Sequence, residues 1–251
     1  MKITFIHHSS FAVEIEDVVL VFDYFEGDRV NGFSFTGVLP EFDKEKSIYF
    51  FASHKHQDHF DRNILKLVEQ YPCIHFIISK DAKMSPHFMS KHGIPASAKE
   101  RITYVVPDGR YTIDTVEVET LRSTDAGVAF LVKTCGKTIY HAGDLHNWRF
   151  EGAGDLINGK MERGYKFALK KLEDKHINAA FVVLDGRLGM HTNLGLSYFM
   201  RTVDADFVFP MHMWQDFSLI TKYKQLCENR LLYERIVDIE HENQVFDTDS
   251  M

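Results

Sequence analysis

The feature that most constrains this chain is a run of metal-binding side chains directly after a predicted strand. An apolar strand at 47–52 leads into Ser53-His54-Lys55-His56-Gln57-Asp58-His59. In an extended segment, residues two apart point to the same side, so His54 and His56 can converge on one ion. The chain then turns, and Asp58 and His59 can address a second point close by. Imidazole nitrogen and carboxylate oxygen suit zinc, iron and manganese.

Composition limits the classes of protein that remain. The 251 residues fit one domain or two small ones, and 45% hydrophobic residues supply a sizeable core. A net charge of −7 argues against a general binder of nucleic acid. Cys73, Cys135 and Cys227 form no CxxC pair, so we expect reduced thiols and a cytoplasmic location. The start of the chain has no signal-peptide pattern and the longest apolar runs are of strand length, so no membrane partner is expected.

Hydrophobic periodicity predicts strands and helices in both halves of the chain. Strands are predicted at 3–6, 11–15, 18–22, 47–52, 74–78, 102–106, 111–113, 116–121, 129–133, 137–141, 179–184, 207–209 and near 235–239. Helices are predicted after Asp61 as an N-cap, at 86–92, 161–175, 194–203 and 217–227, and residues 25–46 are predicted to form a long loop. This pattern indicates an α+β protein with two sheets packed face to face and helices outside.

The histidine-rich segment resembles the HxHxDH motif of the metallo-β-lactamase superfamily. Two later residues strengthen the resemblance: Asp144 of the Gly143-Asp144 pair ends the strand at 137–141, and His212 follows a strand near the C-terminal end. The resemblance covers roughly residues 1–240. It implies a four-layer αββα sandwich of two mixed β-sheets flanked by helices, with the whole chain 1–251 forming a single domain.

The resemblance also implies a set of metal ligands. His54 and His56 would bind a first ion, Asp58, His59 and His212 a second, and Asp144 would bridge both. One or two divalent metal ions are therefore expected, with zinc the default and iron, manganese or nickel served by the same donors. Asp58 is the candidate catalytic residue, because a carboxylate on the metal can orient an attacking water molecule.

One position departs from the family pattern. A further histidine normally completes the first metal, but Ser123 stands where it is expected, and serine is a poor zinc ligand unless deprotonated. Asp125 and His146 are the two alternatives for filling the gap.

Four more residues are candidate substrate contacts. His8, in a His-Ser turn, and Arg187, in Asp185-Gly186-Arg187, resemble features of the ascorbate-phosphate lactonase-like branch of the superfamily. A turn histidine on the surface and an Arg–Asp pair that holds a loop are equally compatible with these two patterns. Trp148 could form a pocket wall or simply cover the core, and His191 could reach the pocket or lie on the surface.

These features favour a metal-dependent hydrolase acting on a small-molecule ester, lactone or phosphodiester. The alternative is a metal-binding or ligand-sensing protein of the same fold without turnover, which Ser123 alone supports. Nucleases of the superfamily usually carry a large inserted domain that this chain has no room for. The di-iron reductases have Glu where this chain has His56.

Overall fold

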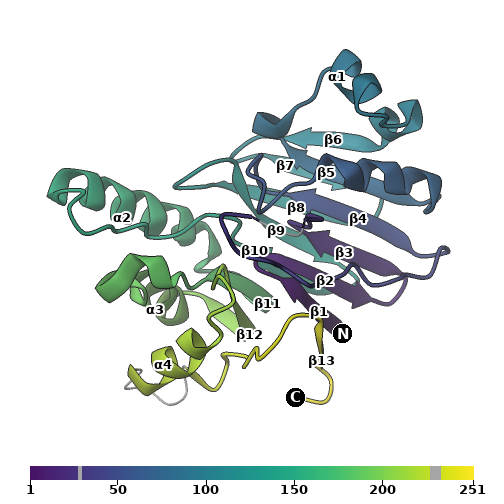
Figure 1. Cartoon of the computed structure of the whole chain (residues 1–251). Helices are drawn as coiled ribbons and strands as arrows, with labels where there is room; N and C mark the ends of the chain where they lie inside the picture. Colours follow the sequence, from purple (N-terminus) through teal and green to yellow (C-terminus); the bar gives the residue numbers. More distant parts are fainter. Residues whose placement is uncertain (28–29, 227–232) are drawn as a thin grey trace. The chain divides into compact units, whose positions relative to one another are not determined.

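The computed structural model describes residues 1–27, 30–226 and 233–251. Internal contacts divide the chain into two compact units. Unit 1 comprises residues 1–106 and 242–251, and unit 2 comprises residues 107–241 (Figure 1). Each unit is built on one β-sheet.

Unit 1 contains a seven-stranded mixed sheet with the order β13-β1-β2-β3-β4-β5-β6. Its strands are β1 (Lys2–His7), β2 (Ser10–Ile15), β3 (Val18–Phe22), β4 (Ser47–Ala52), β5 (Ile74–Ser79), β6 (Ile102–Val105) and β13 (Gln244–Asp247). Its helical segments are η1 (Arg62–Glu69), η2 (Lys80–Ala82), α1 (Pro86–Lys91) and η3 (Ala96–Arg101), of which the η segments are 3-10 helices.

Local sequence explains these elements. β3 and β4 are rich in β-branched and aromatic residues, and β3 is buried along its whole length. Fully buried phenylalanines such as Phe50 and Phe76 each contribute about 1.5–3 kcal/mol of hydrophobic free energy. Glu16 takes a positive φ of 50° in the tight turn between β2 and β3. Asp61 caps η1 as predicted, because its side chain accepts a hydrogen bond from the Asn63 N–H.

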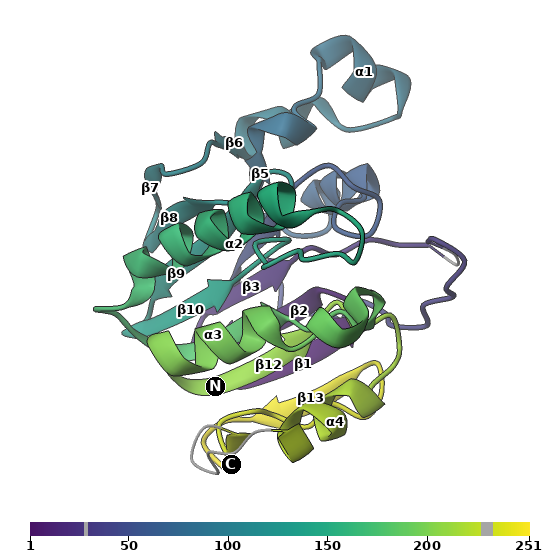
Figure 2. The ribbon, with the colours of Figure 1, turned by 90° about the vertical axis from the view of Figure 1, so that its left-hand side faces the viewer.

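Unit 2 contains a six-stranded mixed sheet with the order β12-β11-β10-β9-β8-β7. Its strands are β7 (Arg110–Ile113), β8 (Val116–Arg122), β9 (Val128–Thr134), β10 (Lys137–His141), β11 (His176–Val183) and β12 (Asp204–Met211). Its helical segments are α2 (Asp155–Leu169), η4 (Lys170–Leu172), η5 (Gly186–His191), α3 (Leu194–Thr202) and α4 (Ser218–Leu226). Figure 2 shows α2 and α3 side by side on one face of this sheet.

The predicted fold class is confirmed: the protein is α+β, with two mixed sheets and helices beside them. One predicted strand is wrong, and one predicted helix has different bounds. The strand expected near 235–239 is reduced to one isolated bridge between Val208 and Ile236, and the last strand is β13 instead. The helix predicted at 161–175 begins earlier, at Asp155, and ends as a 3-10 turn.

The described residues also bear on the cysteines and on membrane-spanning helices. Cys73 and Cys135 are free thiols, while Cys227 lies outside the described residues. Within the three described ranges, no helix is both long enough and apolar enough to cross a membrane.

Candidate metal centre

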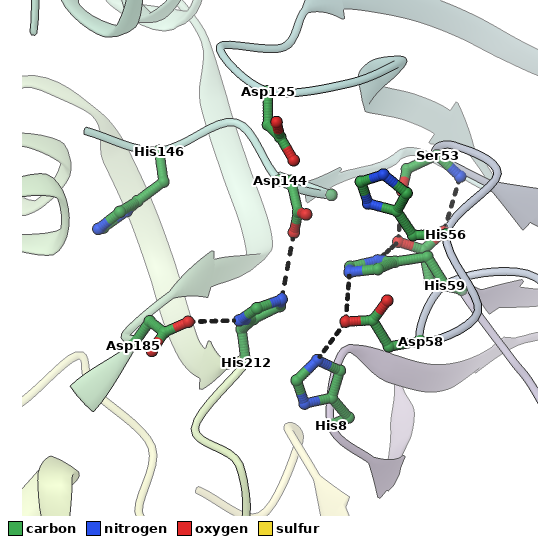
Figure 3. A network of polar contacts seen from close by, with 12 residues as sticks. His8, Ser53, His56, Asp58, His59, Asp125, Asp144, His146, Asp185 and His212 are labelled. Carbon is green, nitrogen blue, oxygen red and sulfur yellow. Dashed lines mark hydrogen bonds and ion pairs between the residues drawn. The ribbon is translucent and has the colours of Figure 1, made fainter. Parts of the chain in front are cut away.

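In unit 1, candidate ligands gather where β1, β3 and β4 end. These three strands run in the same direction, so their carboxyl ends meet at one edge of the sheet. His8 follows β1, Asp23 follows β3, and the segment 53–59 follows β4. In Figure 3, His8, Asp58 and His59 point toward one another. Nε2 of His8 lies 3.5 Å from Oδ2 of Asp58, and Nε2 of His59 lies 3.8 Å from the same oxygen.

A buried carboxylate fixes the orientation of His59. Oδ2 of Asp23 lies 2.7 Å from Nδ1 of His59, and Asp23 also accepts hydrogen bonds from the Ser53 N–H and hydroxyl. Because a carboxylate only accepts hydrogen bonds, Nδ1 of His59 carries the proton and Nε2 keeps its lone pair. A carboxylate on one ring nitrogen is the usual companion of a histidine whose other nitrogen binds a metal.

His54 and His56 form a close pair beside this group. Nε2 of His54 lies 2.9 Å from Nδ1 of His56, as expected for residues two apart in an extended segment. Nδ1 of His54 lies 2.9 Å from the Ser53 hydroxyl, which orients the ring. His54 is buried and His56 is exposed. The two nitrogens are close enough for one ion to bind both.

In unit 2, three parallel strands bring candidate ligands to one edge. Asp144 follows β10, Asp185 follows β11, and His212 follows β12. Nε2 of His212 lies 3.4 Å from Oδ1 of Asp144 (Figure 3). Asp144 is held by the turn at Gly143, whose N–H donates to Nδ1 of His141.

His212 has a buried carboxylate of its own. Oδ2 of Asp185 lies 2.9 Å from Nδ1 of His212, and Nε1–H of Trp214 donates to the same oxygen. Burial opposes ionisation of Asp185, but hydrogen bonds from His212 and Arg187 outweigh burial and hold its pKa well below the ordinary value. Asp185 is therefore an acceptor at neutral pH, and Nε2 of His212 keeps its lone pair.

Backbone strain marks the same positions in both units. His8, Asp23 and His212 have φ values of 47°, 45° and 65°. Residues other than glycine rarely adopt this left-handed conformation, and such strain is concentrated at functional sites. The strain sets the direction in which each side chain leaves the end of its strand.

Of the two alternatives for the gap at Ser123, Asp125 lies among the clustered donor atoms. A carboxylate oxygen of Asp125 lies within 4.8 Å of one of Asp144, and the Ser123 hydroxyl accepts the Asp125 N–H. Ser123 therefore orients Asp125. Among the described residues, His146 belongs to no group of clustered donor atoms. Its ring is fully buried, packs against Gly195, and has its pKa lowered to about 3 by burial.

The predicted substrate contacts fall into different places. His8 lies in the unit 1 cluster, and Trp148 lies in the unit 2 cluster, where its Nε1–H donates to the Asp144 carbonyl 2.8 Å away. Arg187 forms a two-nitrogen pair with Asp185 and lies over the Trp214 ring, 4.6 Å from its centroid. His191 is partly buried at the end of η5 and, within the described ranges, is outside the clustered donors. Substrate contact by any of these four remains a prediction.

The two anchoring carboxylates were not among the site residues predicted from sequence. Asp23 lies one position and Asp185 two positions after a largely buried strand, and the candidate ligands also follow strand ends. That position is the one signal that could have identified them.

Comparison with known proteins agrees with this fold. A model of the beta-lactamase superfamily domain matches residues 2–153. Igni18, a metallo hydrolase from Ignicoccus hospitalis, is similar with 17% identity, 98% of each chain covered and a TM-score of 0.63. A structure described as a possible metal-dependent hydrolase from Veillonella parvula has 12% identity, 98% coverage of each chain and a TM-score of 0.61. YhfI from Bacillus subtilis, a metallo-beta-lactamase fold protein, has 13% identity, 98% coverage of each chain and a TM-score of 0.58.

At these identities the structural matches indicate the fold alone. None of the curated protein sequences compared with this chain matches it. The family model, however, spans more than half of the chain and includes the histidine-rich segment. This chain therefore belongs to the metallo-β-lactamase superfamily.

Proposed function

We propose that this protein is a metal-dependent hydrolase of a small-molecule ester, lactone or phosphodiester. In this proposal His54 and His56 bind one divalent ion, Asp58, His59 and His212 bind a second, and Asp144 binds both. That donors of both units serve the same ions is inferred from the order of the motifs along the chain. Asp125 adds a carboxylate beside Asp144, at the place where Ser123 replaces the family histidine.

The observation that carries the proposal is the anchoring of one histidine in each unit. Asp23 holds Nδ1 of His59, and Asp185 holds Nδ1 of His212. Each ring is thereby fixed in the tautomer that a metal requires, and both anchors are fully buried. The donor set of imidazole nitrogens and carboxylate oxygens fits zinc, and it fits iron, manganese and nickel as well.

A divalent ion bound by these residues would supply Lewis-acid chemistry, because it polarises the oxygen of the bond to be broken and acidifies water. Asp58 would orient the attacking water and accept its proton, because its carboxylate lies beside the donor nitrogens of His8 and His59. The water oxygen forms the new bond to carbon or phosphorus. The bond to the leaving oxygen breaks, and the proton passes to that oxygen. No serine or cysteine nucleophile is required.

A narrower form of this proposal places the protein in the ascorbate-phosphate lactonase-like branch of the superfamily. It rests on the His8-Ser9 turn and on Asp185-Gly186-Arg187, both of which lie at ligand-bearing strand ends. Arg187 already pairs with Asp185, so a substrate anion would have to share this guanidinium with that carboxylate.

The test begins with metal content per chain, measured by elemental mass spectrometry on untagged protein purified without chelator. We expect about two equivalents, as in two-metal hydrolases. The loaded protein is then assayed with a chromogenic acetate ester, a simple lactone and bis(p-nitrophenyl) phosphate. The His59→Ala variant should lose both metal and turnover.

Two outcomes would redirect the proposal. Full metal content with no turnover of any probe would favour a metal-binding or sensing role. Metal content unchanged in His59→Ala would mean that the ligand assignment is wrong.

A further inference from the structure

Unit 2 contains a cavity that none of the proposed metal ligands lines. It has a volume of about 480 Å³ and lies between α2 and the end of β8 with the turn that follows. Ile157, Met161 and Gly164 line it at spacings of four and three residues, which places them on one face of α2. A different set of α2 side chains, including Tyr165 and Leu169, is buried in the unit core.

The α2 face of this cavity is unusually apolar for a surface. Ile157 and Phe167 line the cavity and remain 58% and 68% exposed. Gly164 has no side chain to fill the space between them, and a Cβ there would lie 3.3 Å from the Thr124 side chain. Exposed apolar side chains gathered around a hollow are typical of a ligand site.

The charged side chains around the cavity are mostly positive. Arg122, Lys160 and Lys171 line it, with Asp108 as the single carboxylate. Lys171 and Arg122 both pair with Asp108. Within the described part of the chain, Lys160 has no carboxylate partner. In a chain of net charge −7, this local excess of cations favours an anion.

We propose that this cavity binds an amphiphilic monoanion, namely an alkyl carboxylate of medium chain length. The hydrocarbon chain lies along Ile157, Met161 and Phe167, and the carboxylate faces Lys160 and Arg122. The volume falls within the range of small-molecule sites. The proposal is independent of the proposed hydrolase activity, because none of the lining residues is a proposed metal ligand.

Isothermal titration calorimetry with octanoate and decanoate tests this site. We expect saturable binding at one site, and decanoate should bind about tenfold tighter than octanoate, since each buried methylene adds about 0.8 kcal/mol to the affinity. Acetate, which lacks the chain, should not bind. Decanol, which lacks the charge, should bind more weakly than decanoate.

Matched variants locate the ligand. Met161→Trp fills the cavity and should weaken decanoate binding about tenfold, whereas Met161→Leu should bind like the wild type. Lys160→Glu should weaken decanoate binding about fivefold without affecting decanol. Lys170→Glu is the charge control, because Lys170 is exposed just beyond α2 and does not line the cavity. Metal content and far-UV circular dichroism should stay unchanged in all four variants, which separates this test from that of the metal centre.

Three results would overturn the proposal. The first is the absence of saturable binding up to millimolar ligand. The second is equal decanoate affinity in Met161→Trp and Met161→Leu, or in Lys160→Glu and Lys170→Glu. The third is a dimer in sedimentation velocity that Phe167→Ser converts to a monomer, because the occupant of the apolar face would then be a second copy of the chain.

Discussion

The two units carry their candidate ligands in opposite ways. In unit 1, His54, His56, Asp58 and His59 come from one short segment after a single strand. In unit 2, Asp144 and His212 come from the ends of different strands, far apart in sequence. A contiguous motif is recognisable from sequence alone, whereas a dispersed one requires the parallel strands that bring its parts to one edge.

Despite this difference, the two units share one anchoring device. Each places a fully buried aspartate just past a strand, Asp23 one position after β3 and Asp185 two positions after β11, and uses it to hold Nδ1 of a histidine. The aspartate sets the tautomer of the histidine ring. The strained backbone at His8, Asp23 and His212 sets the direction in which each side chain leaves the end of its strand. The anchors, more than the spacing of the ligands, are therefore what the two clusters have in common.

The largest effect is expected from removing one anchored histidine in each unit. His59→Ala and His212→Ala should each lower kcat/KM about 1,000-fold, because loss of a ligand removes several kcal/mol of transition-state stabilisation. Elemental analysis should show a matching loss of metal. His176→Ala is the control, since His176 pairs with Asp204 and Asp206 at the other end of β11. Loss of activity in one variant alone would mean that only one unit supplies the reaction.

The anchors themselves should have the next largest effect. Asp23→Asn and Asp185→Asn should each weaken metal binding about 10–100-fold in competition with a chelator. Asp23 also joins the ends of β3 and β4 through Ser53, so its variant should melt at the lower temperature of the two. Breaking the ion pair between Arg187 and Asp185 should lower the free energy of unfolding less, because the Arg187 side chain is half exposed.

Ser53→Ala serves as the control for this second role. It removes the hydroxyl bond to Asp23 and the hydroxyl contact to His54, but keeps the bond from the Ser53 N–H and the bond from His59 to Asp23. Metal affinity should therefore change less than in Asp23→Asn. Wild-type affinity in both aspartate variants would show that the anchors are structural only.

The contiguous cluster was easier to predict from the sequence than the dispersed one, for a physical reason. Residues 53–59 lie two apart in an extended segment, so their common direction follows from local geometry. Asp125 could not be distinguished from His146, because the choice depends on how the turn after β8 folds onto the Asp144 turn. There the Thr124 hydroxyl donates to the His146 carbonyl 2.6 Å away.

The fold could be predicted from the sequence about as well as the candidate ligands. Strands buried on both faces were located correctly because long runs of β-branched and aromatic residues mark them. The segment near 235–239 contains three apolar residues, Ile236, Val237 and Ile239, yet it makes only one bridge, at Ile236. β13 is short, half exposed and was not predicted, because its place beside β1 is a pairing across nearly the whole chain.

A smaller effect should distinguish Asp125 from His146. Asp125→Asn should weaken binding of one metal equivalent about tenfold, as expected when a carboxylate near an ion loses its charge. His146→Gln should bind metal like the wild type. Asp114→Asn, in the turn between β7 and β8, is the charge control. The reverse result, with loss of metal in His146→Gln alone, would assign the missing ligand to His146.

The smallest effect compares one buried histidine in each unit. Burial lowers the pKa of His7 in unit 1 to about 4 and that of His146 in unit 2 to about 3. Unfolding exposes each ring, which then takes up a proton below its ordinary pKa of 6.5, so the free energy of unfolding falls as the pH drops. For each residue the loss between pH 7 and pH 6 should be about 0.7 kcal/mol in metal-free protein.

Urea titrations at the two pH values measure this loss, and two probes show whether the units unfold together. Both tryptophans, Trp148 and Trp214, lie in unit 2, so their fluorescence follows that unit, whereas far-UV circular dichroism follows both sheets. If the chain is a single domain, His7→Gln and His146→Gln should each reduce the pH dependence of the free energy of unfolding measured by both probes. His87→Gln, at an exposed position, is the control and should leave this pH dependence unchanged. If His7→Gln changes the circular dichroism transition but not the tryptophan transition, the two units unfold separately. The shared anchoring device would then belong to two domains rather than one.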